Sequence, residues 1–221
     1  KKERTRQINR IKGLLASQGV RLPVKADFAQ GLESVRAWDG SPLLPRLQAR
    51  LVREYERLEF VGKQIKELER QRVQEIRQSQ DPKVEQVRRL MRLNGIGVNS
   101  SWQFIMEFFG WREFRSGKEV GGLSGLVPTP YQSGSSYREQ GMSKAGNRHV
   151  RAMAVEIAWG WLGYQPESEL TKWYEKRFGQ GSKRIRKIGI VALARRLLVE
   201  LWRYLETGAI PQGAVLKTRL I

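Results

Sequence analysis

Residues 43–80 read LLPRLQARLVREYERLEFVGKQIKELERQRVQEIRQSQ, and this stretch decides how the chain is organised. An apolar side chain recurs every seven residues, at Leu44, Leu51, Leu58 and Ile65. The second core position of the heptad is filled in most repeats, by Leu47, Val61 and Leu68, and is polar at Glu54 and Glu75. This spacing predicts one long helix over about 43–80, which Asp81-Pro82 ends.

The heptad stripe leaves two interpretations open. The helix is either an ordinary long helix of a bundle or a coiled-coil arm, folded back on residues 3–18 or paired with another chain. Residues 3–18 place four apolar side chains on one helical face, before a stop at Gly19. A short helix is expected over 25–37. We therefore assign residues 1–82 to a helical, coiled-coil region that assembles dimers or tetramers.

The composition points to a nucleic-acid partner. The 221 residues include 41 Lys and Arg against 22 Asp and Glu, which gives a net charge of +19. Cysteine is absent and His149 is the single histidine, so disulfides, thiolate nucleophiles and zinc fingers are excluded and no metal site is expected. No apolar run of 18 residues is present, and we expect a cytoplasmic, nucleoid-associated protein without membrane contact.

Residues 83–221 contain 17 of the 22 glycines and are expected to form a compact helical domain. A short helix after Pro82 is followed by Asn94-Gly95-Ile96-Gly97-Val98 and a second helix over 99–109. This arrangement is typical of a helix–hairpin–helix, in which Gly95 and Gly97 let backbone N–H groups face a phosphate. The alternative is that both glycines only make a tight turn between helices.

Residues 121–147 are rich in Ser, Gly and Pro, and we expect an irregular functional loop there, above all over 121–142. Ser133 precedes Gly134, which allows a sharp turn that exposes the hydroxyl group. Because no aspartate follows Asp81, an aspartate-based catalytic triad or two-metal site cannot form within residues 83–221. The alternative is that Ser133 to Ser136 are ordinary polar loop residues.

Two further segments concentrate cations that suit a phosphate backbone. The first leads into an apolar helix over 152–162 and carries Ser143, Lys144, Asn147, Arg148 and Arg151. The second opens the last long helix, over 185–205, with Lys183, Arg184, Arg186 and Lys187. Trp159, Trp161 and Tyr164 are expected in the core, and the last ten residues in a loose tail.

Three strings carry a family resemblance: LNGIGVNS (93–100), EFRSGKEVGGLSGLVPTPYQSGSSYREQGMSKAGNRHVR (113–151) and VALARRLLVELWRYLETGAIP (191–211). They resemble the serine domain of bridge-RNA-guided insertion-sequence transposases, whose relatives include the Piv-type DNA invertases. NRIKGLLASQGV (9–20) is similar to the region before that family's coiled coil. The resemblance covers nearly the whole chain and is strongest over 90–151.

The resemblance implies a catalytic role for Ser133, as the nucleophile that forms a phosphoserine link to DNA. It implies phosphate contacts for the neighbouring loop and basic residues, among them Gly134, Ser135, Ser136 and Arg138. It also implies Mg²⁺ bound by acidic residues of a ribonuclease-H-like domain, a composite site between protomers, and a structured guide RNA that pairs with target and donor DNA. That acidic domain is absent, so this chain alone is not expected to recombine DNA.

The sequence therefore predicts an all-α fold, with a coiled-coil arm and a compact domain that contains a helix–hairpin–helix and a long Ser/Gly-rich loop. The predicted function is DNA transposition by the serine part of a recombinase. The alternative is a non-enzymatic DNA- or RNA-binding module with an oligomerisation arm, in which Ser133 is inert.

Overall fold

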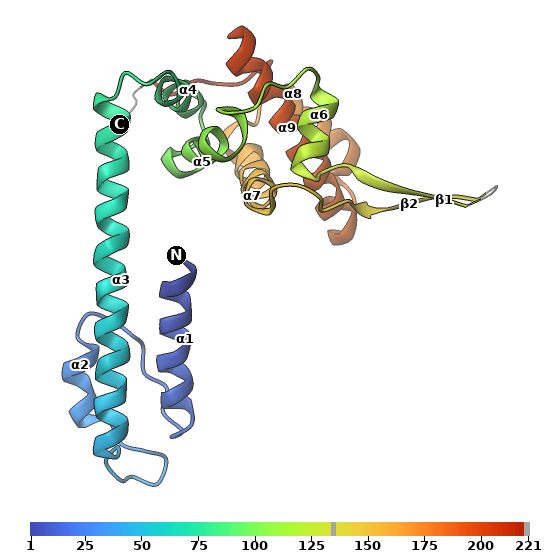
Figure 1. Cartoon of the computed structure of the whole chain (residues 1–221). Coiled ribbons are helices and arrows are strands. Elements are labelled where there is room, and N and C mark those ends of the chain that lie inside the picture. Colours follow the sequence, from blue (N-terminus) through green and yellow to red (C-terminus); the bar gives the residue numbers. More distant parts are fainter. Residues whose placement is uncertain (134–135, 219–221) are drawn as a thin grey trace. The chain divides into compact units, whose positions relative to one another are not determined.

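The computed structural model describes the backbone of residues 1–133 and 136–218, and the side chains of these residues apart from 130–140. Most of the described chain is helical, which confirms the predicted mainly α-helical fold (Figure 1). The contacts divide the chain into Lys1–Gln74 and Glu75–Ile221, compared with the predicted division at residue 82. Ile76 explains part of this offset, because it is buried in the second core with Val84.

The first unit is built on α1 (Lys2–Ala16) and on α3 (Pro45–Gln78), which extends to residue 78 beyond the unit. Ile11 and Leu15 of α1 share a core with Leu51 of α3. The ion pairs Arg10–Glu54 (3.3 Å) and Lys1–Glu69 (3.4 Å) show that the two helices run antiparallel. The short elements α2 (Phe28–Gly31) and η1 (Leu32–Ser34) add Phe28 and Leu32 to this core.

Helix α3 begins at Pro45, two residues later than predicted, because proline lacks the N–H that a helix interior requires and suits the first turn. Leu51 and Leu58 of the heptad stripe are buried, whereas Leu44 and Leu68 are 68% and 61% exposed. The packing of α1 on α3 corresponds to the folded-back arrangement. Pairing of the exposed part of the stripe with another chain stays a prediction.

The second unit is organised around α9 (Lys183–Thr207). One side of α9 is buried along its length, through Ile190, Leu193, Leu197, Leu198 and Leu201. Helices α4, α6, α7 and α8 contact α9, and together they form one apolar core (Figure 1). The bounds of the surrounding elements are α4 Pro82–Met91, α5 Val98–Phe104, η2 Ile105–Phe109, α6 Gly117–Ser124, α7 Arg148–Tyr164, α8 Glu169–Tyr174 and η3 Glu175–Gly179.

The loop prediction for residues 121–147 was wrong. Helix α6 continues to Ser124, and an antiparallel hairpin of β1 (Pro128–Ser133) and β2 (Ser136–Met142) follows. The register pairs Tyr131 with Arg138 and Ser133 with Ser136. Thr129, Tyr131 and Tyr137 are residue types that favour strands, and a hairpin confines its turn-forming residues to a short connection. The density of Ser, Gly and Pro therefore led to the prediction of a longer irregular segment than the structure has.

The C-terminal segment up to residue 218 packs against the domain, contrary to the predicted loose tail, whose residues 219–221 lie outside the described residues. The backbone N–H of Lys217 donates to Arg92 O (2.7 Å), and its Nζ donates to Ile96 O (2.6 Å). Burial lowers the pKa of Lys217. The fully buried Gln165 joins this segment to α7, because its Nε2 donates to Asn94 O and Val215 O and its Oε1 accepts from Val215 N.

The three hydrogen bonds of Gln165 predict a stability effect. Gln165→Leu keeps a similar volume but removes the partner of the part-buried Asn94 O and Val215 N, whereas Val215 O keeps its bond from Asn94 N (3.1 Å). The free energy of unfolding in urea should fall by about 1–3 kcal/mol. Gln180→Leu is the matched control, because Gln180 is exposed, and should change stability by less than about 0.5 kcal/mol. Equal effects of the two variants would contradict this role of Gln165.

Candidate nucleic-acid interface

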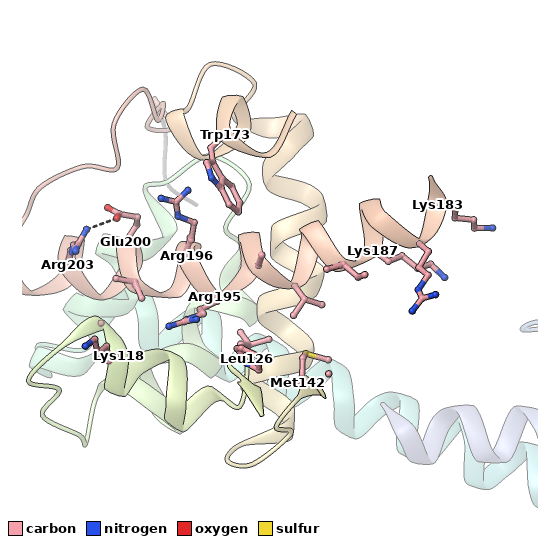
Figure 2. Close-up of a pocket in the computed structure, with 18 residues that line it drawn as sticks. Lys118, Leu126, Met142, Trp173, Lys183, Lys187, Arg195, Arg196, Glu200 and Arg203 are labelled. Atoms are coloured by element: carbon pink, nitrogen blue, oxygen red, sulfur yellow. Dashed lines mark hydrogen bonds and ion pairs between the residues drawn. The ribbon is translucent and has the colours of Figure 1, made fainter. Parts of the chain in front are cut away.

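A groove of about 1500 Å³ runs along the outward side of α9 in the second unit (Figure 2). Its walls come from the start of α6, from the base of the hairpin and from Trp173 of α8. The hairpin contributes Pro128, Gly141 and Met142, so the strands that carry Ser133 arise at the edge of the groove.

Helical periodicity explains why one side of α9 lines the groove. Its lining residues form two rows with a spacing of four, which places them on adjacent strips of one helical face. The rows are 184, 188, 192, 196 and 200, and 187, 191, 195, 199 and 203. The buried leucines of α9 lie between these rows in sequence, on the opposite side, so a single helix serves both the core and the groove.

The groove is strongly basic. Among its described lining residues the cations are Lys118, Lys183, Arg184, Lys187, Arg195, Arg196 and Arg203. The only carboxylate in this set is Glu200, which pairs with Arg203 at 2.8 Å. Within the part of the chain that the structure describes, the other six cations have no carboxylate partner. Their charge is therefore free to attract a polyanion.

Close packing of α6 on α9 fixes the position of one of these cations. A Cβ atom at Gly121 would lie 2.8 Å from Nε of Arg195, and one at Gly117 would lie 2.8 Å from Cγ1 of Val199. Both glycines therefore permit α6 to approach α9 more closely than larger residues would. This approach brings Lys118 and Arg195 to the same groove (Figure 2).

The predicted residues before α7 form a second cluster, and several of them hold the local structure together. Asn147 caps α7 by accepting from His149 N (2.8 Å) and Val150 N (3.2 Å), and its Nδ2 donates to Glu107 (3.2 Å). Arg151 donates to the carbonyl oxygens of Ser124 and Ala145. The exposed Lys144 has φ 56°, a left-handed conformation that is uncommon for a residue other than glycine.

The same segment is locked against the end of α6. A Cβ atom at Gly125 would overlap Ala145 O, and one at Gly146 would overlap Leu123 O. Ser143 donates its backbone N–H to Val127 O (2.9 Å), and its hydroxyl oxygen is buried. Arg148 is exposed and donates to His149 Nε2 (3.3 Å). Arg148 and Lys144 are therefore the exposed cations of this cluster.

The proposed nucleophile lies at the end of the hairpin. Ser133 is the last residue of β1 and pairs with Ser136 of β2, while Arg138 pairs with Tyr131 nearer the base. Gly134 and Ser135 lie outside the described residues. In Figure 1 the two strands project from the helices of the second unit. The predicted site residues are therefore divided between the hairpin, the segment before α7 and the start of α9.

Gly95 and Gly97 lie in the turn between α4 and α5. Neither glycine is among the residues that line the groove. Gly95 has φ +87° and packs against Tyr164, where a Cβ atom would lie 3.0 Å from the tyrosine Cβ. The N–H of Gly97 donates to Ser100 Oγ (3.0 Å). The positive φ and the contact with Tyr164 account for glycine at Gly95, whereas no atom lies within 4 Å of where a Cβ atom of Gly97 would be. Phosphate binding by this turn stays a prediction.

Three of the four cations predicted at the start of α9 line the groove: Lys183, Arg184 and Lys187. Arg186 is exposed but is not among the lining residues. Sequence reasoning missed Arg195, Arg196 and Arg203, which lie within an apolar stretch. Arg195 and Arg196 follow Lys187 and Ile188 by eight residues, and Arg203 follows Arg195 by eight, which was the available signal.

No group of three or more His, Asp or Glu side chains among residues 1–129 and 141–218 is placed to hold a metal ion. Over the same residues, no helix is both long and apolar enough to cross a membrane.

Comparison with known proteins supports the predicted resemblance at the family level. Residues 87–173 match the family described as "Transposase IS116/IS110/IS902 family". "Putative transposase y4rJ" of Sinorhizobium fredii is 41% identical over 98% of this chain and 57% of its own length. "Transposase for insertion sequence element IS1328" of Yersinia enterocolitica is 25% identical over 95% of this chain and 60% of its own length. The chain thus spans a little over half of these relatives.

The groove predicts a local effect of charge on nucleic-acid binding. In a triple variant, Lys183→Ala, Arg184→Ala and Lys187→Ala, affinity for duplex DNA should depend less steeply on salt. The plot of log affinity against log salt should lose about 2–3 from the magnitude of its negative slope, since each phosphate contact contributes about 0.9. Fluorescence anisotropy over a series of salt concentrations measures this slope.

The matched control removes three exposed cations of α3 with Arg50→Ala, Lys63→Ala and Lys66→Ala. It should leave the slope nearly unchanged. If both triple variants lowered the slope equally, binding would follow total charge and the groove would not be the interface. Arg186→Ala measures separately whether the cation outside the groove contributes to DNA affinity.

Proposed function

We propose that the chain, whose residues 87–173 match a transposase domain of the IS116/IS110/IS902 type, supplies the serine-nucleophile part of a DNA transposase. The observation that carries the proposal is the position of Ser133 at the end of a hairpin whose base lines a basic groove. In this proposal the groove holds DNA and the hairpin presents the serine to a phosphodiester.

The chemistry assigned to Ser133 is a transesterification. Its hydroxyl oxygen attacks the phosphorus atom of a DNA phosphodiester and gives up its proton, which forms a phosphoserine bond. The bond from phosphorus to the leaving deoxyribose oxygen breaks, and that oxygen takes up a proton. No high-energy cofactor is consumed, because one phosphate ester replaces another. Serine is a weak nucleophile and needs activation by other groups.

The length of the hairpin supports a composite site. Five strand steps separate Pro128 at the groove from Ser133, which corresponds to roughly 16 Å at about 3.3 Å per residue. A serine carried that far from its own domain is suited to a site completed by another part of the assembly. The Mg²⁺ implied by the resemblance would be held by acidic residues of the ribonuclease-H-like domain that the resemblance also implies.

The remaining parts of the proposal follow from the resemblance. A structured guide RNA would select target and donor DNA, and the α1–α3 arm would join protomers as dimers or tetramers. Arg138, Lys144 and Arg148 would position or neutralise phosphates. Gly134 would let Ser133 approach the scissile phosphate, and Ser135 and Ser136 would contact the nucleic acid. These roles are proposals for the whole protein, of which this chain is one part.

A non-enzymatic binding module is the second candidate function. The observation in its favour is the groove itself, because its unpaired cations need only charge complementarity to hold a polyanion. In that case Ser133 would be an inert strand residue. The two functions differ in one measurable respect, which is the formation of a covalent bond between protein and DNA.

Ser133→Ala should abolish both strand cleavage and the covalent protein–DNA adduct when the acidic domain, Mg²⁺ and the guide RNA are supplied. DNA affinity should change by less than about twofold, and stability by less than about 0.5 kcal/mol, because one hydroxyl group is removed from a projecting strand. Denaturing gel electrophoresis of labelled DNA measures the adduct.

Ser136→Ala is the control, because Ser136 pairs with Ser133 across the hairpin and is the same residue type. It should retain the adduct, at a reduced rate. An adduct that persists in Ser133→Ala would overturn the assignment. The same holds if peptide mass mapping places the adduct on Ser135, Ser136, Ser143, Tyr131 or Tyr137.

A further inference from the structure

The groove along α9 combines two kinds of surface. Its cations are accompanied by an apolar floor that includes Ile188, Val191, Ala192 and Val199, together with Met142 of the hairpin. Ile188 is 51% exposed beside these apolar residues, and a contiguous exposed apolar patch, unlike a single exposed side chain, is typical of a binding surface. A partner that fills this groove must therefore offer both negative charge and apolar surface.

The size of the groove favours an extended ligand over a small molecule. Its volume of about 1500 Å³ exceeds the range of roughly 300–1,000 Å³ that pockets for small molecules occupy. The lining residues extend from Lys183 to Arg203, and 20 residues of helix correspond to about 30 Å. An elongated polyanion fits these dimensions.

One wall of the groove presents stacked planar groups. The guanidinium carbon of Arg196 lies 4.2 Å from the centre of the Trp173 ring, and Phe178 meets the same ring edge-on at 5.5 Å. Trp173 and Arg196 lie side by side above α9 in Figure 2. Guanidinium and indole planes are surfaces on which nucleobases stack.

These features favour a single strand over a duplex. A duplex turns its phosphates outward and keeps the faces of its bases inside, so it would satisfy the cations but leave the apolar floor in water. An unpaired strand offers phosphates to the cations and base faces to Ile188, Trp173 and Arg196. The same floor would cover part of the apolar surface of the bases.

The polar groups of the groove offer little that would select RNA, so the choice of DNA follows from the proposed function. Recognition of a ribose 2′-hydroxyl is aided by a hydrogen-bond acceptor, because the hydroxyl can donate. Among the described lining side chains the only carboxylate is Glu200, and Arg203 already occupies it. The groove therefore has cations for phosphates but little with which to select a ribonucleotide.

We propose that the groove along α9 binds single-stranded DNA, with phosphates on Lys183, Lys187 and Arg195 and bases against Ile188 and the Trp173–Arg196 stack. This inference rests on the proposed function and specifies the form of DNA that the domain holds. An unpaired segment next to the hairpin base would bring flexible DNA toward the strand that carries Ser133.

The test is fluorescence anisotropy of the 221-residue chain with labelled oligothymidylate of about 15 nucleotides, the matching duplex and oligouridylate, all at one salt concentration. Wild type should bind the single DNA strand about tenfold more tightly than the duplex, and at least as tightly as the RNA. Equal or tighter binding of the duplex would overturn the proposal. Clearly tighter binding of oligouridylate would overturn the assignment to DNA.

Two substitutions locate the effect. Arg196→Lys keeps the positive charge but removes the guanidinium plane, and Ile188→Gln removes apolar surface at a half-exposed position without a change of charge. Each should weaken single-strand binding about fivefold or more and leave duplex binding within about twofold, on the scale of one lost stacking contact. Circular dichroism checks that both variants are folded.

The charge-matched control is Arg177→Lys, an exposed arginine of η3 that does not line the groove. It should bind all three ligands as wild type does. If Arg196→Lys and Ile188→Gln weakened duplex and single strand equally, or neither, the groove would not bind bases. This failure is distinguishable from failure of the proposed function, because the adduct lost in Ser133→Ala is measured independently of strand preference.

Discussion

Burial of one side of α9 is the packing interaction on which the second unit depends. Leu193, Leu197, Leu198 and Leu201 are at most 1% exposed, and each fully buried leucine contributes about 1.5–3 kcal/mol through the hydrophobic effect. Because α4, α6, α7 and α8 all contact this helix, its orientation is fixed by four neighbours. The opposite side of α9 therefore faces away from the core. Its cations line the groove and are not buried among the apolar side chains.

The hairpin and the segment before α7 are positioned by that arrangement. The close approach of α6 to α9 depends on Gly117 and Gly121, and the end of α6 is locked against residues 145–146 by Gly125. The base of the hairpin is therefore anchored at the groove while its far end projects (Figure 1). A rigid binding surface and a projecting serine suit a protein in which DNA is held by one part and cleaved in a site completed by another.

The sequence predicted the helical class, the long helix over 43–80 and the turn at residues 94–98, since each rests on local periodicity or glycine placement. It did not predict the hairpin, because strand pairing depends on partners across the turn. Trp159 and Tyr164 were expected in the core with Trp161, but they are 44% and 59% exposed. Residues two apart on a helix differ by about 200°, so Trp159 and Trp161 cannot share a face.

The candidate site was also predictable only in part, because it depends on how the helices pack. Lys183, Arg184 and Lys187 form a dense run that stands out, whereas Arg195 and Arg196 lie within an apolar stretch and join the groove through the geometry of α9. Which face of a helix remains open depends on the packing of its neighbours. The role of Ser133 came from a family resemblance, and its place at the end of a strand came from the structure.

We propose that the outward side of α9 is the surface that holds DNA. Photo-cross-linking would locate this surface, with a single strand that carries a photoreactive thymidine and with peptide mass mapping of the adducts. Cross-links are expected within residues 173–203 and at the base of the hairpin, near Met142. Cross-links confined to residues 1–74, or to the turn at Gly95 and Gly97, would contradict it.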